Sequence, residues 1–209
     1  QFYLFPCRCI AGGYRGLSLV CKNANLATIA LALGNVKDPI NSLVIEDGAI
    51  ARLVGPLFKD KTISALTIRH STLTDIDGDS LACLKQEIRS LELDDARFTT
   101  LPDAVNVLPN LTRLALTNTP TAVGEVKGSA FKKLVNLIEL DLRNNSIKKI
   151  DSSTLTPLTV LGELLLLPLI ARSCCVVFTR LSFFSLSRSF ALAVNCFSAR
   201  HLFATNHNC

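Results

Sequence analysis

The sequence predicts an α/β solenoid, in which the strands of a short parallel β-sheet are joined by helical, 3₁₀ or extended return segments. The prediction depends on a spaced pattern of Leu and Ile, on its recurrence along the chain, and on the alternation of apolar and polar residues within each copy. In residues 137–150, Leu140 and Leu142 alternate inward from a short strand, and Leu137 supplies part of the apolar floor. Asn145 points inward too, where its amide can satisfy backbone groups at the bend after the strand.

The pattern recurs at intervals of 23 to 26 residues, which indicates stacked repeat units. Its first position falls at Ile40, Ile63, Ile88, Leu111, Leu137 and Leu161. The fourth position falls at Leu43, Leu66, Leu91, Leu114, Leu140 and Leu164, and the sixth at Ile45, Ile68, Leu93, Leu116, Leu142 and Leu166. We therefore expect five to six parallel strands, with the fourth-position residues from Leu43 to Leu140 stacked in one buried column.

The spacing L-x-x-L-x-L-x-x-N-x-L, which is complete in residues 137–150, resembles the leucine-rich repeat. The resemblance covers about residues 7–166. The segment Cys7-Arg8-Cys9, followed after eleven residues by Cys21, is similar to the cysteine-rich N-terminal cap of extracellular leucine-rich-repeat proteins. This resemblance implies a disulfide between Cys7 and Cys21.

The remaining cysteines and the start of the chain fit a capped solenoid. Of eight cysteines, three lie near the start and four in the last stretch, which suits disulfide caps and an oxidising compartment. A zinc site is the alternative, but three cysteines without a nearby His make a poor tetrahedral set. Within the expected cap, residues 1–39, we expect an edge strand at residues 17–20 and a short helix or half-repeat at residues 26–33. Cys83 lies in a return segment and is expected to be a buried, unpaired thiol.

The expected repeats occupy residues 40–166, and the pattern ends after Leu166. We do not expect the atypical tail, residues 167–209, to continue the solenoid. A degenerate C-terminal cap, a membrane anchor and non-native sequence are the three explanations. Composition favours a non-native tail, because it contains no Lys, Asp or Glu but six of the eleven Phe. An anchor needs about twenty uninterrupted apolar residues, whereas arginine recurs every eight residues, at Arg172, Arg180 and Arg188.

Charge is distributed unevenly along the chain. The formal net charge is +5, but residues 1–163 hold eighteen Lys or Arg against seventeen Asp or Glu. A nucleic-acid-binding surface would need a basic stripe on one face. The nearly neutral repeats therefore argue against a nucleic-acid partner.

The polar positions of each predicted strand line the concave face of the sheet. The seventh position reads Glu46, Arg69, Asp94, Thr117 and Arg143, and the eighth reads Asp47, His70, Asp95, Asn118 and Asn144. Three interpretations stay open: a partner-binding patch, lateral charge pairing that only keeps the sheet soluble, and an Asp-His-Asp cation site. For a binding surface, the expected residues are Glu46, Arg69, His70, Asp94, Asp95, Arg113 and Arg143.

Catalytic motifs are lacking from the sequence. There is no Gly-x-Ser-x-Gly elbow, phosphate-binding glycine loop or His-Glu-x-x-His pair. Asp75, Asp77 and Asp79 alternate around Gly78, but the spacing of a calcium loop is absent. We expect neither an enzyme nor a bound cofactor, and a metal-dependent enzyme centred on Asp47, His70 and Asp95 is the alternative.

Two N-glycosylation sequons are present, Asn110-Leu111-Thr112 and Asn144-Asn145-Ser146, and a secreted protein can be modified at both. A glycan on Asn144 would obstruct the concave face and move partner binding elsewhere. The resemblance implies protein-protein recognition through the concave face, in a chain that is secreted or on the cell surface. A membrane-anchored receptor or adhesion fragment, or a non-catalytic subunit of a secreted complex, is the alternative.

Overall fold

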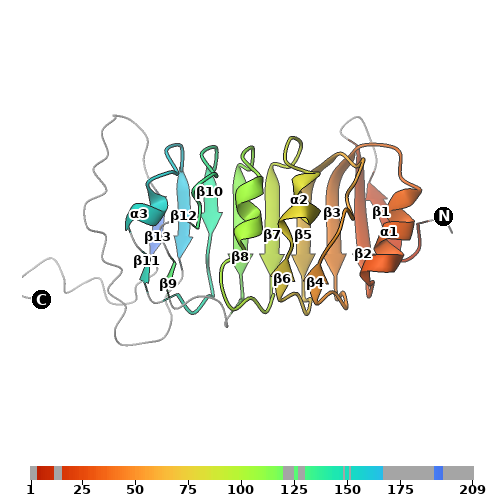
Figure 1. Ribbon diagram of the computed structural model, residues 1–209, viewed down its shortest axis with the longest axis horizontal. Coiled ribbons are helices and arrows are strands. Elements are labelled where there is room, and N and C mark those ends of the chain that lie inside the picture. Colours follow the sequence, from red (N-terminus) through yellow and green to blue (C-terminus); the bar gives the residue numbers. More distant parts are fainter. Residues whose placement is uncertain are drawn as a thin grey trace, which may run out of the picture.

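A computed structural model describes residues 4–11, 16–119, 125–126, 130–147, 149–150, 152–166 and 191–194. Its main sheet is an elongated row of strands (Figure 1) in the order β1-β2-β3-β5-β7-β8-β10-β12-β13. These strands are β1 (Cys7–Ala11), β2 (Leu17–Lys22), β3 (Ile40–Glu46), β5 (Ile63–Arg69), β7 (Ser90–Asp94), β8 (Arg113–Thr117), β10 (Glu139–Asp141), β12 (Glu163–Leu166) and β13 (Ala191–Val194). Neighbours pair in parallel except β1 and β2, which are antiparallel.

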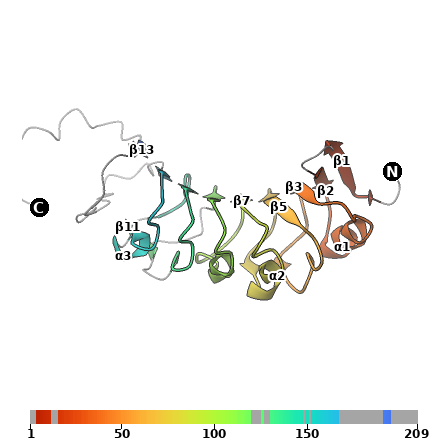
Figure 2. The same cartoon turned by 90° about the horizontal axis from the view of Figure 1, so that it is seen from above.

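The return segments lie on one side of this sheet. They contain α1 (Leu26–Gly34), α2 (Gly78–Ala82), the 3₁₀ helix η2 (Asp103–Val107) and α3 (Ser152–Leu155). Two small parallel sheets pair β4 (Arg52–Leu53) with β6 (Asp75–Ile76), and β9 (Glu125–Val126) with β11 (Lys149–Ile150). Figure 2 shows the main strands along a shallow arc, with α1, α2 and α3 on its outer side. The predicted α/β solenoid is confirmed.

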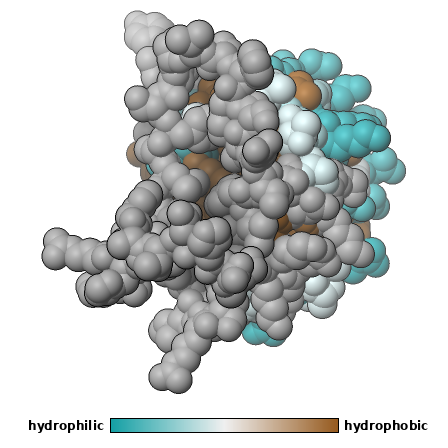
Figure 3. Space-filling model, turned by 90° about the vertical axis from the view of Figure 1, so that its left-hand side faces the viewer, coloured by the Kyte–Doolittle hydropathy of each residue, from teal (hydrophilic) through white to brown (hydrophobic). Residues whose placement is uncertain are grey.

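The buried column of fourth-position residues is present. Leu43, Leu66, Leu91, Leu114, Leu140 and Leu164 are partners in successive strand pairs, and each is at most 3% exposed. Because a parallel strand alternates its side chains, this register also buries the sixth position from Ile45 to Leu142. An end-on view shows hydrophobic residues toward the middle and hydrophilic residues along one side (Figure 3).

Asn145 joins two neighbouring turns from inside, as its place in the pattern predicts. Its Nδ2 donates to the carbonyl oxygens of Leu116 (2.6 Å) and Leu142 (3.0 Å). Its Oδ1 accepts from the backbone N–H of Thr119 at 3.0 Å and from the Thr119 hydroxyl. The amide thus satisfies backbone groups where the chain leaves the strand, although it is only 7% exposed.

The N-terminal region contains the predicted helix but differs in its edge strand. Asn25 begins α1 with a capping box, in which its Oδ1 accepts from the Thr28 N–H at 3.0 Å and Thr28 Oγ1 accepts from the Asn25 N–H at 3.1 Å. The prediction that residues 17–20 form an edge strand is wrong, because β2 pairs with β1 on one side and β3 on the other. A disulfide joins Cys7 to Cys21 across β1 and β2, which is the pairing that the resemblance implies.

Cys83 is exposed, so the prediction of a buried thiol is wrong, and it forms no disulfide. It is the C-cap residue of α2. That helix has only five residues. The side chains of Leu81 and Leu84 point into the core, since both residues are 0% exposed. The intervening thiol therefore faces outward.

Among the described residues, one strand follows Leu166, so the prediction that the tail does not continue the solenoid is wrong for residues 191–194. There β13 pairs in parallel with β12, with Leu192 opposite Leu164 and Val194 opposite Leu166. The interval from Leu164 to Leu192 is 28 residues, longer than any interval in the array, which explains why the pattern did not indicate it. The rest of residues 167–209 lies outside the described residues. No helix in the described parts of the chain is long and apolar enough to cross a bilayer.

Candidate functional site

The outward side chains of strands β2 to β12 form an open surface on the inner side of the arc, opposite the helices (Figure 2). We call this surface the concave face. By strand, it contains Ser18, Val20 and Lys22; Ser42, Val44 and Glu46; Ala65, Thr67 and Arg69; Ser90, Glu92 and Asp94; Arg113, Ala115 and Thr117; Glu139, Asp141 and Arg143; and Glu163 and Leu165. These residues alternate with the buried column, so the same register determines both surfaces.

The N-terminal half of the concave face has a floor of small, uncharged side chains and one row of charges. Glu46 forms ion pairs with Lys22 at 2.8 Å and with Arg69 at 3.5 Å. The hydrogen bond from Lys22, with Arg69 nearby, lowers the pKa of the Glu46 carboxyl below its ordinary value. Arg69 lies beside Asp94 in the strand register, but the ion pair it forms is with Glu46. Its Nε is buried without a hydrogen-bond partner among the described residues.

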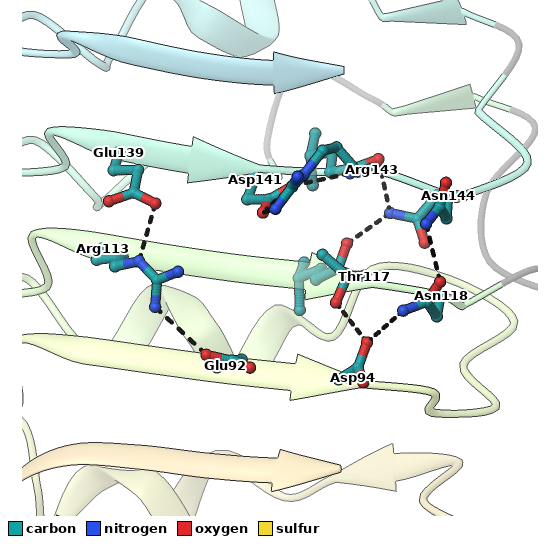
Figure 4. Close-up of polar contacts among 12 residues, drawn as sticks. Glu92, Asp94, Arg113, Thr117, Asn118, Glu139, Asp141, Arg143 and Asn144 are labelled. Atoms are coloured by element: carbon teal, nitrogen blue, oxygen red, sulfur yellow. Dashed lines mark hydrogen bonds and ion pairs between the residues drawn. The ribbon is translucent and has the colours of Figure 1, made fainter. Parts of the chain in front are cut away.

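The C-terminal half carries larger charged side chains that are already paired with one another (Figure 4). Arg113 lies between two carboxylates, with Nε 2.8 Å from Glu139 and a terminal nitrogen 3.3 Å from Glu92. These contacts, mainly the hydrogen bond to Glu139, raise the pKa of Arg113. The guanidinium therefore stays charged and its position is held from both sides.

Asp141 and Arg143 form a second pair in this half. The Asp141 side chain is 2% exposed and accepts from Arg143 Nε at 2.9 Å, from a terminal nitrogen at 2.7 Å, and from the Arg143 backbone N–H at 3.0 Å. The hydrogen bond to Asp141 is the main cause that raises the pKa of Arg143, and Glu139 and Glu163 add to it. Such a bidentate pair has a defined geometry.

A chain of polar side chains follows the C-terminal ends of β7, β8 and β10. Asp94 accepts from Thr117 Oγ1 and from Asn118 Nδ2, both at 2.6 Å. Asn118 Oδ1 in turn accepts from Asn144 Nδ2 at 3.0 Å. This chain connects three repeats along one rim of the concave face (Figure 4).

The five eighth-position residues, and Asn23 at the corresponding place after β2, have left-handed backbone conformations. Their φ angles lie between 49° and 58°, at Asn23, Asp47, His70, Asp95, Asn118 and Asn144. Asn, Asp and His are several-fold enriched in this region. The backbone N–H groups of the first five donate to the seventh-position carbonyl of the next repeat, at 3.0 to 3.3 Å. The backbone at the strand ends thus accounts for the residue types in this column.

His70 and Asp95 were expected to form part of a binding surface or a cation site, and both have this left-handed conformation. Both are exposed at the rim, and His70 Nδ1 is 3.7 Å from Asp47 Oδ1. No group of three His, Cys, Asp or Glu side chains among the described residues is arranged to hold a metal ion. The Asp47, His70, Asp95 cation site therefore has no support from the geometry.

Several members of the charged network were missed in the sequence analysis. Glu139 stands at the third position of the pattern, and Glu92 and Asp141 stand at the fifth. From these two positions, the sequence predicted only Arg113 as a binding residue. The alternation that assigned the seventh position to the concave face also applies to these positions. Applying it to the whole strand would have found them.

The two sequons lie at opposite ends of the strands. Asn110 is half-buried just before β8. Asn144 is exposed and follows β10, beside Arg143. Only Asn144 is therefore next to the polar chain on the rim.

Comparison with known proteins agrees with this fold. Residues 109–166 match the family model described as "Leucine rich repeat". No curated protein matches the sequence. The chain carries leucine-rich repeats over residues 109–166, and its fold is the leucine-rich-repeat solenoid.

Three solved structures illustrate the likeness. A chain of the TLR13-ssRNA13 complex has a TM-score of 0.55 and 20% identity over 70% of this chain and 24% of its own. A chain from the octameric complex of Latrophilin 3, Unc5D and FLRT2, whose FLRT2 part is the leucine-rich-repeat component, has a TM-score of 0.56 and 20% identity over 77% of this chain and 55% of its own. A leucine-rich-repeat protein of Leptospira interrogans has a TM-score of 0.52 and 22% identity over 66% and 33%. This chain thus spans between a quarter and just over half of these proteins, and the likeness establishes the fold alone.

Proposed function

We propose that this chain is an extracellular recognition module that binds a protein partner through its concave face. The observation that carries the proposal is the open concave face itself, because the described helices lie on the other side of the sheet. Its side chains are at least partly exposed, except those of Ala115 and Asp141, which are buried. Its arginines are held by carboxylates before any partner arrives. Side chains that are already ordered lose less conformational entropy on binding.

The charges of the concave face favour a protein over a nucleic acid. The face carries six carboxylates, at Glu46, Glu92, Asp94, Glu139, Asp141 and Glu163, and four basic groups, at Lys22, Arg69, Arg113 and Arg143. A phosphate backbone would meet an excess of negative charge there. The TLR13 structure is a complex with ssRNA13, so a nucleic-acid ligand is the outcome against which the proposal is tested.

The extracellular setting is supported by the disulfide between Cys7 and Cys21. Disulfides persist in oxidising compartments and are rare in the cytosol. The octameric complex of Latrophilin 3, Unc5D and FLRT2 shows one protein of this fold in an assembly of proteins.

A binding screen with matched variants tests the proposal. The full chain is presented to a panel of purified ectodomains and, separately, to single-stranded RNA. Thr67→Arg places a long side chain in the middle of the concave face, whereas Arg52→Ala breaks an ion pair with Asp75 (2.8 Å) in the small sheet β4–β6, away from that face. We expect an ectodomain to bind and Thr67→Arg to weaken binding at least tenfold, with Arg52→Ala unchanged. Binding that survives Thr67→Arg but not Arg52→Ala, or binding to RNA alone, would overturn the proposal.

A further inference from the structure

The sequon at the end of β10 lies at a position where a sugar can be added without loss of existing contacts. Asn144 is exposed and has a φ of 58°. Its Nδ2 carries two hydrogens, and one of them is donated to Asn118 Oδ1 at 3.0 Å. The other has no acceptor among the described residues, so its direction is open for a covalent bond.

The Asn110 sequon is a natural comparison within the same chain. Asn110 is half-buried, and its Nδ2 faces the Gln86 carbonyl at 3.3 Å, and the Lys85 carbonyl and Gln86 Oε1 at 3.5 Å each. A sugar on this nitrogen would displace part of that arrangement. The two sequons therefore differ in how well the folded chain accommodates a glycan.

We propose that Asn144 is an N-glycosylation site and that its glycan limits which part of the concave face a partner can reach. The modification requires the secretory setting of the proposed function, so this inference depends on that proposal. A bond forms between Asn144 Nδ2 and C1 of the first N-acetylglucosamine, and Nδ2 loses one proton. The bond from C1 to the diphosphate of a lipid-linked oligosaccharide donor breaks, and the lipid diphosphate leaves.

The position of Asn144 determines what the glycan covers. Asn144 is the last member of the side-chain sequence Asp94, Asn118, Asn144, which holds its amide at the rim. It directly follows Arg143, whose side chain is 44% exposed. A glycan here shields the Arg143 end of the concave face and leaves the small-residue floor of β2, β3 and β5 open. Partner contacts are thereby directed to the N-terminal half.

The test uses the full chain expressed with a secretion signal in eukaryotic cells, followed by site mapping of glycopeptides. Ser146→Ala removes the sequon and leaves Asn144, with its left-handed backbone, in place. Thr112→Ala removes the other sequon as a matched control, and Ser146→Thr keeps the Asn144 sequon. We expect glycan at Asn144 in the unaltered chain, in Thr112→Ala and in Ser146→Thr, and its loss in Ser146→Ala without a change in melting temperature.

The same samples separate failure of this inference from failure of the proposed function. Non-reducing peptide mapping shows whether Cys7 and Cys21 are joined, and so whether the chain reached an oxidising compartment. A disulfide-bonded chain with an unmodified Asn144 overturns the glycan inference and leaves the proposed function standing. A chain that carries the glycan at Asn144 but leaves Cys7 and Cys21 reduced contradicts the disulfide on which the extracellular proposal depends, and the glycan inference stands.

Discussion

Leu114 occupies the middle of the buried column, and its truncation to Ala measures how strongly the repeats hold one another. The side chain is 0% exposed and lies between Leu91 and Leu140 in the strand register, both also 0% exposed. Burying the removed methyl groups contributes transfer free energy, and the cavity left behind adds to the loss.

The loss of unfolding free energy in Leu114→Ala depends on how far the surrounding side chains can move into the cavity. Hydrogen bonds on both sides hold β8 in the sheet, so the neighbouring leucines cannot move into the space. Leu→Ala substitutions in cores cost about 2 to 5 kcal/mol, and we expect Leu114→Ala to fall in the upper part, at about 3 to 5 kcal/mol. At about 2 to 4 °C per kcal/mol for a chain of this size, the melting temperature should fall by roughly 6 to 20 °C.

The assay compares this variant with a matched leucine on the surface. Leu31 in α1 is 71% exposed, so Leu31→Ala should change the free energy of unfolding by less than about 0.5 kcal/mol. Urea unfolding is followed by far-UV circular dichroism, since the chain has no Trp, and by amide exchange, which detects repeats that unfold separately. A loss below about 1 kcal/mol for Leu114→Ala, or an equal loss for Leu31→Ala, would refute the packing argument.

Other measurements test individual contacts. Asn145→Ala leaves three backbone groups of two turns unpaired and should cost at least about 3 kcal/mol in urea unfolding, at about 1 to 3 kcal/mol for each unsatisfied group; a loss within error would mean that water replaces the amide. His70→Val places a β-branched residue in a left-handed conformation and should cost about 1 to 2 kcal/mol, whereas His70→Asn should be neutral, and equal effects would contradict the backbone explanation of this column. Replacing Cys7 and Cys21 by Ser opens a loop of sequence separation 14 and should lower stability by about 3 kcal/mol, as measured by thermal melting against the oxidised parent. The lowered pKa of Glu46 means that its carboxylate stabilises the fold above the ordinary carboxyl pKa and that this contribution disappears as pH falls through the lowered value. Glu46→Gln should therefore weaken the acid dependence of the urea midpoint, and an unchanged dependence would count against the ion pair.

The sequence alone determined the repeat register and with it most of the core. Leu and Ile at positions one, four and six mark the inward direction, and a parallel strand leaves one choice of face once that direction is known. The concave positions of Glu46, Arg69, Asp94 and Arg143 follow from the same alternation. The inward amide of Asn145 also follows, because a buried bend needs partners for its backbone groups.

Only the tertiary structure decided which charged side chains pair and which residues the backbone required. Arg69 has a carboxylate on each side in the strand register, and its distance to Glu46 shows which of them it pairs with. The eighth-position residues, which include His70, resembled a polar binding patch in the sequence. Asp, Asn and His are suited to binding a partner and are also enriched in the left-handed backbone conformation. The strand at residues 191–194 was not indicated because β-pairing depends on the arrangement of backbone groups in space, and a distant segment without the full apolar pattern can still provide them.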